Sequence, residues 1–196
     1  MPDITLAVDF GTSNSAAAVL ENGQVRRLQI EPGADTLPTA VFFPVGGDMI
    51  IGSAAAEAMM SGAEGRYMRA LKSILGTPLL HEQRRIGGRR PSLADVVAAF
   101  LAALIARAEA VTGGKVVKVL SGRPVRFHSA NEARNRQAEA DLRACYGLAG
   151  ISDVAFLFEP EAAARAAQVT GLGLIVDMGG GTSDFTVFRS GARLDV

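Results

Sequence analysis

Short apolar runs separated by turn residues occupy the first part of the chain and predict a group of strands. Residues 4–8, 16–20 and 25–30 form three such runs, and Glu21-Asn22-Gly23 joins the second to the third. Asn-Gly is a strong signal for a two-residue hairpin turn, because both residues tolerate positive φ angles. Residues 40–43 form another short apolar run. The chain is therefore expected to begin with three antiparallel strands, followed by a fourth after a break at residues 36–39.

Apolar residues spaced three and four positions apart predict helices further along. The clearest helix follows Ser92, which has the spacing of a capping box with Asp95, and it ends at Gly113-Gly114. Four other segments are expected to be helical, and residues 79–91 are expected to be an exposed loop. These helical segments are residues 53–60, 66–75, 131–146 and 160–168.

Apolar runs between and after these helices predict further strands. The runs are residues 116–120, 154–158, 172–176 and 185–188. Early hairpins followed by alternating helices and strands are typical of a mixed α/β fold.

Composition narrows the classes of function. The 196 residues include 20 basic and 20 acidic side chains, a balance without the electrostatic signature of a nucleic-acid or membrane-surface partner. The single cysteine, Cys145, and two separated histidines, His81 and His128, predict no disulfide and no histidine metal site. The N-terminus lacks a signal-peptide pattern, and the longest apolar run is too short to cross a bilayer, so a cytoplasmic protein is expected. The preference for arginine over lysine suggests a GC-rich bacterial genome.

One pattern occurs twice, each time after one apolar strand and before another. The first copy is Asp9-Phe10-Gly11-Thr12, and the second is Asp177-Met178-Gly179-Gly180-Gly181-Thr182. Glycine lets backbone N–H groups approach a phosphate closely, and Thr12, Ser13 and Thr182 add hydroxyl donors. A carboxylate before each turn can hold Mg²⁺ through water. Either copy alone could be a simple tight turn, but the matched pair favours two hairpins that grip a magnesium–nucleotide.

On these motifs the chain resembles the heat-shock 70 kDa chaperones within the actin-like ATPase superfamily. Residues 9–15 and 177–184 are similar to the two phosphate motifs of that family, and residues 158–164 to its connecting segment. Residues 122–127 resemble the short YegD-type members, and residues 70–76 the segment that holds the catalytic lysine. The resemblance implies an α/β, ribonuclease H-like lobe of the actin-like ATPase type. Its mixed sheet would open with antiparallel hairpins and be flanked by helices.

The resemblance also implies a division of the chain. Residues 1–35 and 92–170 would form the core subdomain of the first lobe, residues 36–91 a small inserted subdomain, and residues 171–196 the start of a second lobe. Because ATPase domains of the family are longer, the chain is expected to be the N-terminal lobe of a larger protein. This part alone is expected to be inactive.

Site roles follow from the same resemblance, residue by residue. Asp9, Glu159 and Asp177 would order Mg²⁺ and its waters, and Lys72 would contact the terminal phosphate and the attacking water. Thr182 is expected to act in catalysis beside them, and Pro124 to couple nucleotide state to domain movement. The residues expected to line the phosphates are Gly11, Thr12, Ser13, Asn14, Gly179, Gly180, Gly181 and Thr182.

The implied function is slow ATP hydrolysis, with ATP/ADP and Mg²⁺ as cofactors and a client or co-chaperone protein as partner. Nucleic acid and membrane are not expected as partners. Glu161 departs from the family pattern by placing a second acid beside Glu159, which leaves open a nucleotide-sensing scaffold without hydrolysis. An actin- or cell-shape-type filament protein is the other alternative. The Asn14-Ser15 ending and the segment around Lys72 argue against the filament protein.

Overall fold

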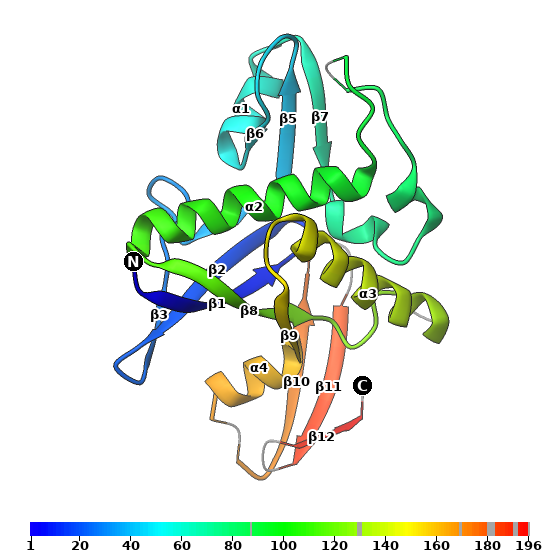
Figure 1. The fold of residues 1–196 in the computed structure, drawn as a ribbon. Coiled ribbons are helices and arrows are strands. Elements are labelled where there is room, and N and C mark those ends of the chain that lie inside the picture. Colours follow the sequence, from blue (N-terminus) through cyan, green and yellow to red (C-terminus); the bar gives the residue numbers. More distant parts are fainter. Residues whose placement is uncertain (87, 129–130, 169, 180–182, 190–191, 196) are drawn as a thin grey trace.

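The computed structural model describes residues 1–86, 88–128, 131–168, 170–179, 183–189 and 192–195 (Figure 1). This part of the chain contains a six-stranded sheet and two three-stranded sheets. Parallel and antiparallel strand pairs occur together in the large sheet, and helices flank it. The mixed α/β fold predicted from the sequence is therefore confirmed. Within the described ranges, no helix is both long and apolar enough to cross a membrane.

The six-stranded sheet has the order β3-β2-β1-β8-β9, with β4 paired to β2. Its first three strands are antiparallel, and the turn between β2 and β3 places Asn22 and Gly23 at φ angles of 51° and 77°. Strands β8 and β9 then extend the sheet in parallel on the other side of β1. The strands are β1 (Asp3–Phe10), β2 (Asn14–Glu21), β3 (Gln24–Arg27), β4 (Thr36–Pro38), β8 (Lys115–Arg123) and β9 (Asp153–Phe158).

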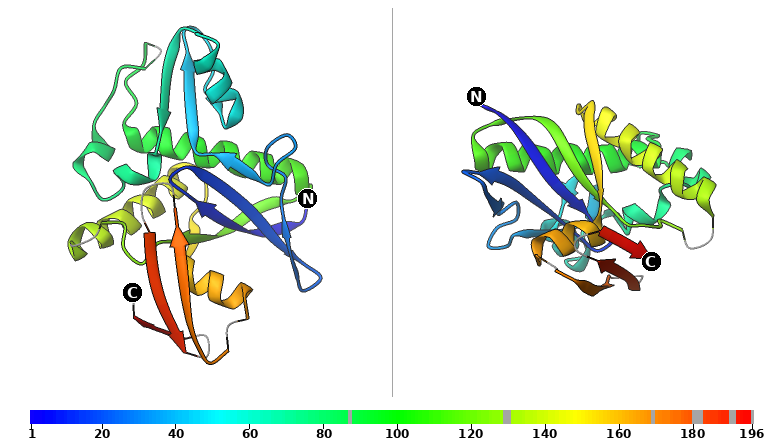
Figure 2. Two further views of the ribbon diagram at one scale, coloured as in Figure 1. Left: turned by 180° about the vertical axis from the view of Figure 1, so that it is seen from behind. Right: turned by 90° about the horizontal axis from the view of Figure 1, so that it is seen from below.

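Alternation along β1 sends neighbouring side chains to opposite faces of this sheet. Leu6, Val8 and Phe10 are buried beneath helix α2 (Leu93–Thr112), and the ring centroids of Phe10 and Phe100 lie 5.8 Å apart. Helix α3 (Glu132–Leu148) lies on the same face, where the hydroxyl of Tyr146 donates to that of Ser121 on β8. Helix α4 (Glu159–Ala166) lies beside the other face of the sheet (Figure 2). Asp9 and residues of α4 line a common pocket.

Helix α2 forms because its local signals agree with its apolar face. The side chain of Ser92 accepts from the backbone N–H of Asp95, and the carboxylate of Asp95 accepts from the backbone N–H of Ser92, completing the expected capping box. Gly113 ends the helix at a φ of 67°, in the left-handed region that glycine adopts readily.

The two smaller sheets lie on opposite sides of this core (Figure 1). One contains β6-β5-β7 and packs against helix α1, and the other contains β10-β11-β12 and follows α4. Their elements are β5 (Ala40–Pro44), β6 (Ile50–Ile51), α1 (Ser53–Met60), β7 (Gly65–Arg69), β10 (Leu172–Met178), β11 (Ser183–Arg189) and β12 (Ala192–Asp195).

The helix expected at residues 66–75 is wrong. Residues 65–69 are strand β7, which pairs antiparallel with β5 across its whole length. Ala70 then adopts a φ of 55°, and the 3₁₀ turn Leu71–Ile74 follows it. The backbone hydrogen bonds to β5 are non-local and outweigh the local helical spacing, which is a weak signal over ten residues.

Other boundaries also differ from the expectation. Residues 36–38 form strand β4 where a break was expected, and α3 continues through Gly147 to Leu148. The loop expected at residues 79–91 contains part of the 3₁₀ turn Pro78–His81, and it buries Leu80 and Ile86.

Candidate functional site

A cavity of about 460 Å³ collects most of the predicted site residues. It lies where the turn after β1, the 3₁₀ turn carrying Lys72, the segment after β8, the start of α4 and the end of β10 meet. The predicted residues that line it are Asp9, Gly11, Thr12, Ser13, Asn14, Lys72, Pro124, Glu159, Asp177 and Gly179. Gly180, Gly181 and Thr182 lie outside the described residues.

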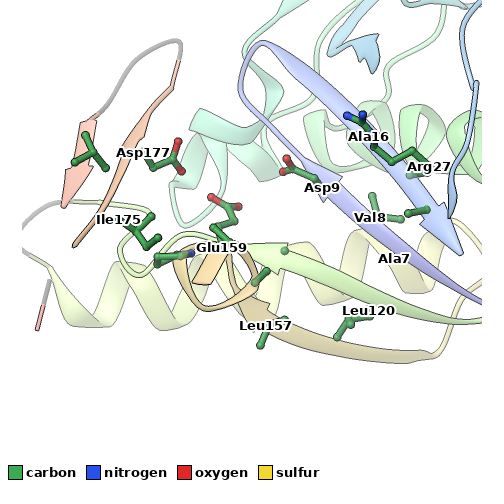
Figure 3. Close-up of a pocket in the computed structure, with 17 residues that line it drawn as sticks. Ala7, Val8, Asp9, Ala16, Arg27, Leu120, Leu157, Glu159, Ile175 and Asp177 are labelled. Atoms are coloured by element: carbon green, nitrogen blue, oxygen red, sulfur yellow. The ribbon is translucent and has the colours of Figure 1, made fainter. Parts of the chain in front are cut away.

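Three carboxylates converge beside this cavity. Asp9, Glu159 and Asp177 point toward one shared space (Figure 3). Asp9 lies near the end of β1, Glu159 directly follows the end of β9, and Asp177 lies near the end of β10. Since β1, β8 and β9 are parallel, the first two carboxylates meet at the carboxyl edge of the sheet, where open α/β sheets bind ligands.

Lys72 reaches this carboxylate group from the inserted part of the chain. Its Nζ atom lies 2.7 Å from Oε1 of Glu159 and donates a hydrogen bond to it. The two side chains are only 11% and 21% exposed, so water screens this ion pair less than it screens a surface pair. The contact joins residues 87 positions apart and fixes the ammonium group at the cavity wall.

The carboxylates carry more negative charge than the protein around them neutralises. Burial raises the pKa of Glu159 above its usual range, Lys72 opposes this rise, and Asp9 and Asp177 add to it. The Asp9 side chain is exposed to the cavity, but the walls of the cavity limit its contact with water. This desolvation raises the pKa of Asp9. Lys72 again opposes the rise, and Asp177 again adds to it. A cation bound here would favour the ionised form of both groups.

The donor set fits a hydrated magnesium ion. Carboxylate oxygens are the ligands that Mg²⁺ prefers, and Mg²⁺ commonly keeps several waters. In the described part of the chain, no group of three or more acidic, histidine or cysteine side chains is arranged to hold a metal directly. Three convergent carboxylates with unneutralised charge therefore suit an ion held through its water molecules.

The turn after β1 is tied to Thr39, which lies between β4 and β5. The carbonyl of Ser13 accepts a hydrogen bond from the backbone N–H of Thr39 at 2.8 Å. The buried hydroxyls of Ser15 and Thr39 also lie 2.8 Å apart. Gly11 has no room for a side chain, because a Cβ atom there would lie 2.1 Å from the backbone oxygen of Asn14. The turn is thus held rigidly, with its glycine required by close backbone approach.

Some residues that line the cavity were not predicted from the sequence. Ser73, Arg126 and Phe127 lie on its wall with Lys72 and Pro124. Arg126 and Phe127 belong to the segment at 122–127 on which the resemblance rests, and their closeness to Pro124 was the available signal. Glu161 does not line the cavity, so its extra charge lies outside the convergent carboxylates.

The protein is thus of the mixed α/β class, with a glycine turn and a lysine-bound carboxylate cluster at one edge of its large sheet. The family model for the Hsp70 protein matches residues 5–86. The chain is 30% identical over 197 residues to the chaperone protein DnaK of Endomicrobium trichonymphae, covering 96% of this chain and 30% of that protein. It is also 30% identical over 211 residues to the chaperone protein HscA of Edwardsiella ictaluri (strain 93-146), covering 95% of this chain and 32% of that protein.

The family model and both relatives support the Hsp70 family for this chain. Its mixed sheet with flanking helices is consistent with the actin-like ATPase lobe of that family. The chain spans about a third of the length of the curated relatives it matches.

Proposed function

We propose that this chain is the N-terminal lobe of the nucleotide-binding domain of a YegD-type Hsp70 relative. The complete protein would bind ATP with Mg²⁺, hydrolyse it slowly and change shape for a client or co-chaperone protein. The Lys72–Glu159 pair supports this proposal best, because it sets a buried cation among convergent carboxylates beside a rigid phosphate turn.

Each residue would contribute by position and charge, which is most of what phosphoryl transfer needs from a protein. Backbone N–H groups of residues 11–14 would bind phosphate oxygens, with Thr12 and Ser13 adding hydroxyls. Asp9, Glu159 and Asp177 would hold the waters of Mg²⁺, which when bound neutralises charge on the phosphates. Lys72, oriented by Glu159, would contact the terminal phosphate and position the attacking water.

The second phosphate hairpin completes this proposal. Gly179 lines the same cavity as the first turn. The family motif that this segment resembles assigns Gly180, Gly181 and Thr182 to phosphate binding as well. ADP would remain bound through the same turns after the terminal phosphate is released.

Pro124 is proposed to couple the nucleotide to movement of the protein. It lines the cavity and follows β8 directly, at the beginning of the segment that leads to α3. A change at the terminal phosphate would therefore displace Pro124, a residue with a restricted backbone that lies between β8 and α3.

The proposed subdomains correspond to the three sheets. Residues 1–35 and 92–170 contribute most of the six-stranded sheet and its helices, residues 36–91 contain β5, β6 and β7, and residues 171–196 contain β10, β11 and β12. Strand β4 pairs with the large sheet although it lies after residue 35, so the inserted sheet itself begins at Ala40.

Single-turnover ATP hydrolysis by the complete encoded protein tests the proposed activity. With Mg²⁺ present, Lys72→Ala is expected to reduce the rate by roughly 100-fold or more while ATP binding persists. Lys118→Ala is the matched control, because Lys118 pairs with exposed Asp153 outside the cavity and should leave the rate unchanged. ATP binding without turnover in the parent protein would instead support the sensing scaffold.

A further inference from the structure

The turn that carries Lys72 is held at its far end by groups from α3 and from the segment before α3. The carbonyl of Leu75 lies 2.6 Å from Nε2 of His128, and the backbone N–H of Gly76 donates to Oδ2 of Asp141 at 2.8 Å. We propose that His128 and Asp141 are positioning residues for Lys72. This inference rests on the proposed ATPase function and concerns the regulation of the same site.

Asp141 is a buried and fixed acceptor. Its side chain is 4% exposed, and besides Gly76 it accepts a hydrogen bond at 2.8 Å from the side chain of Gln137, one turn earlier on α3. His81 lies 3.7 Å away on the solvent side. A buried carboxylate requires such partners, so the position of the Gly76 amide is tied to the body of α3.

Gly76 itself is shaped for this contact. It adopts a φ of 71°, and a Cβ atom there would lie 2.4 Å from the backbone oxygen of Arg134 on α3. Glycine both accepts this left-handed conformation and permits the close approach. The chain therefore touches α3 directly after the turn that carries Lys72, where a larger residue would push the turn away.

His128 provides the second attachment, from a different segment. A carbonyl oxygen can only accept, so Nε2 of His128 carries the hydrogen and donates to Leu75. The backbone N–H of His128 donates to Oδ1 of Asn135 on α3, which fixes the residue that bears the ring. His128 lies four residues after Pro124 in the segment whose Arg126 and Phe127 line the nucleotide cavity.

These attachments act on Lys72 through a short and rigid path. Lys72 and Leu75 belong to one 3₁₀ turn and its C-cap, and Leu71 and Leu75 are both buried. A shift of Leu75 or Gly76 would therefore move the Lys72 backbone and lengthen the 2.7 Å contact to Glu159. The segment after Pro124 would in this way set the position of the proposed catalytic lysine.

The first test measures this attachment without reference to catalysis. In the complete protein, His128→Leu removes the donor and His128→Gln can restore an N–H at a similar reach. Lys118→Ala, at an exposed ion pair with Asp153, is the control. Hydrogen exchange of the backbone around residues 71–77 is expected to be about five- to tenfold faster in His128→Leu and like the parent in the other two. Melting temperatures identify any variant that is merely unstable. Parent-like exchange in a stable His128→Leu protein would overturn the inference.

The second test separates positioning from binding. His128→Leu is expected to lower the single-turnover rate about five- to tenfold with ATP affinity unchanged, and His128→Gln to restore the rate. A variant that keeps the parent rate, or loses affinity and rate together, would overturn the positioning role. Asp141→Leu serves as a second variant, because it removes both side-chain acceptors, and should likewise speed exchange at Gly76. If the parent protein shows no ATP turnover, the proposed ATPase function is wrong. The contact between His128 and the Lys72 turn is still tested independently by hydrogen exchange.

Discussion

Asp9 shows at the scale of one residue how the proposed cation site would oppose the stability of the protein when no cation is bound. Its pKa is raised in the folded protein, mainly by desolvation. The folded state then binds more protons than the unfolded state at pH values just above the ordinary pKa of aspartate. Its contribution to stability is therefore favourable in acid and is lost as the pH rises through the folded pKa.

Asp9→Asn is consequently expected to increase the free energy of unfolding at neutral pH in the absence of divalent cations. The advantage over the parent should shrink as the pH falls toward 4, because the parent carboxyl becomes protonated there. Urea denaturation of both proteins at the two pH values measures this difference. Asp153→Asn, at an exposed residue paired with Lys118, is the control and should not show the same pattern. A less stable Asp9→Asn protein at neutral pH would contradict the argument.

Gly11 carries a second prediction at this scale. Gly11→Ala is expected to lower ATP affinity at least about tenfold, because the new Cβ would collide with the backbone oxygen of Asn14 and displace the phosphate turn. Gly147→Ala is the control, since a Cβ atom at this helical position meets no atom within 4 Å. That control should bind ATP normally and gain roughly 0.5–1 kcal/mol of stability. Titration calorimetry with ATP compares them, and equal affinities would show that the turn tolerates the change.

Sequence and structure agree best for residues that belong to a recognisable motif. The approach of Asp9, Glu159 and Asp177 was expected from the resemblance, and the structure places all three beside one space. The contact between His128 and Leu75 was not expected, because it joins residues 53 positions apart through a side chain and a carbonyl. Single-sequence patterns carry no information about such a pair.

At the scale of elements, the helices and strands predicted correctly are those for which local sequence signals and tertiary packing favour the same structure. Helix α2 combines a capping box, a terminal glycine and a buried face, and its predicted start and end are confirmed. Strand β7 has no comparable local signal, and its conformation comes from pairing with β5. The Lys72 turn was assigned to a helix for the same reason.

The prediction at the scale of elements concerns how much the N-terminal cap of α2 stabilises the protein. Ser92→Ala removes the acceptor for the N–H of Asp95 and one side of the capping box, so it is expected to lower the free energy of unfolding by about 1 kcal/mol. Ser53→Ala is the control, because Ser53 begins α1 without a side-chain cap and should change stability by less than about 0.5 kcal/mol. Urea denaturation followed by circular dichroism measures both. Equal stability of the two variants would show that burial alone fixes the start of α2.

At the scale of the whole molecule, the cavity is assembled from segments that lie far apart in the chain. Asp9, residues 11–14 and 72–73, Pro124, residues 126–127 and Glu159 line it, and residues 177–179 line it from the strand that follows α4. That last sheet exposes an apolar face, on which Leu174, Val176 and Phe185 remain 44–58% exposed. A nucleotide held here would touch both sides of the junction between the core and β10.

This arrangement predicts that residues 1–196 alone bind ATP weakly or not at all. Charge-assisted hydrogen bonds to phosphate contribute about 1.5–3 kcal/mol each, but association loses about 4–15 kcal/mol of translational and rotational freedom. Phosphate contacts therefore leave little net affinity without further contacts to the base. Titration calorimetry of residues 1–196 with ATP and Mg²⁺ tests this, with the complete protein as the control. Low-micromolar affinity of the isolated residues would mean that the described lobe already contains the whole binding site.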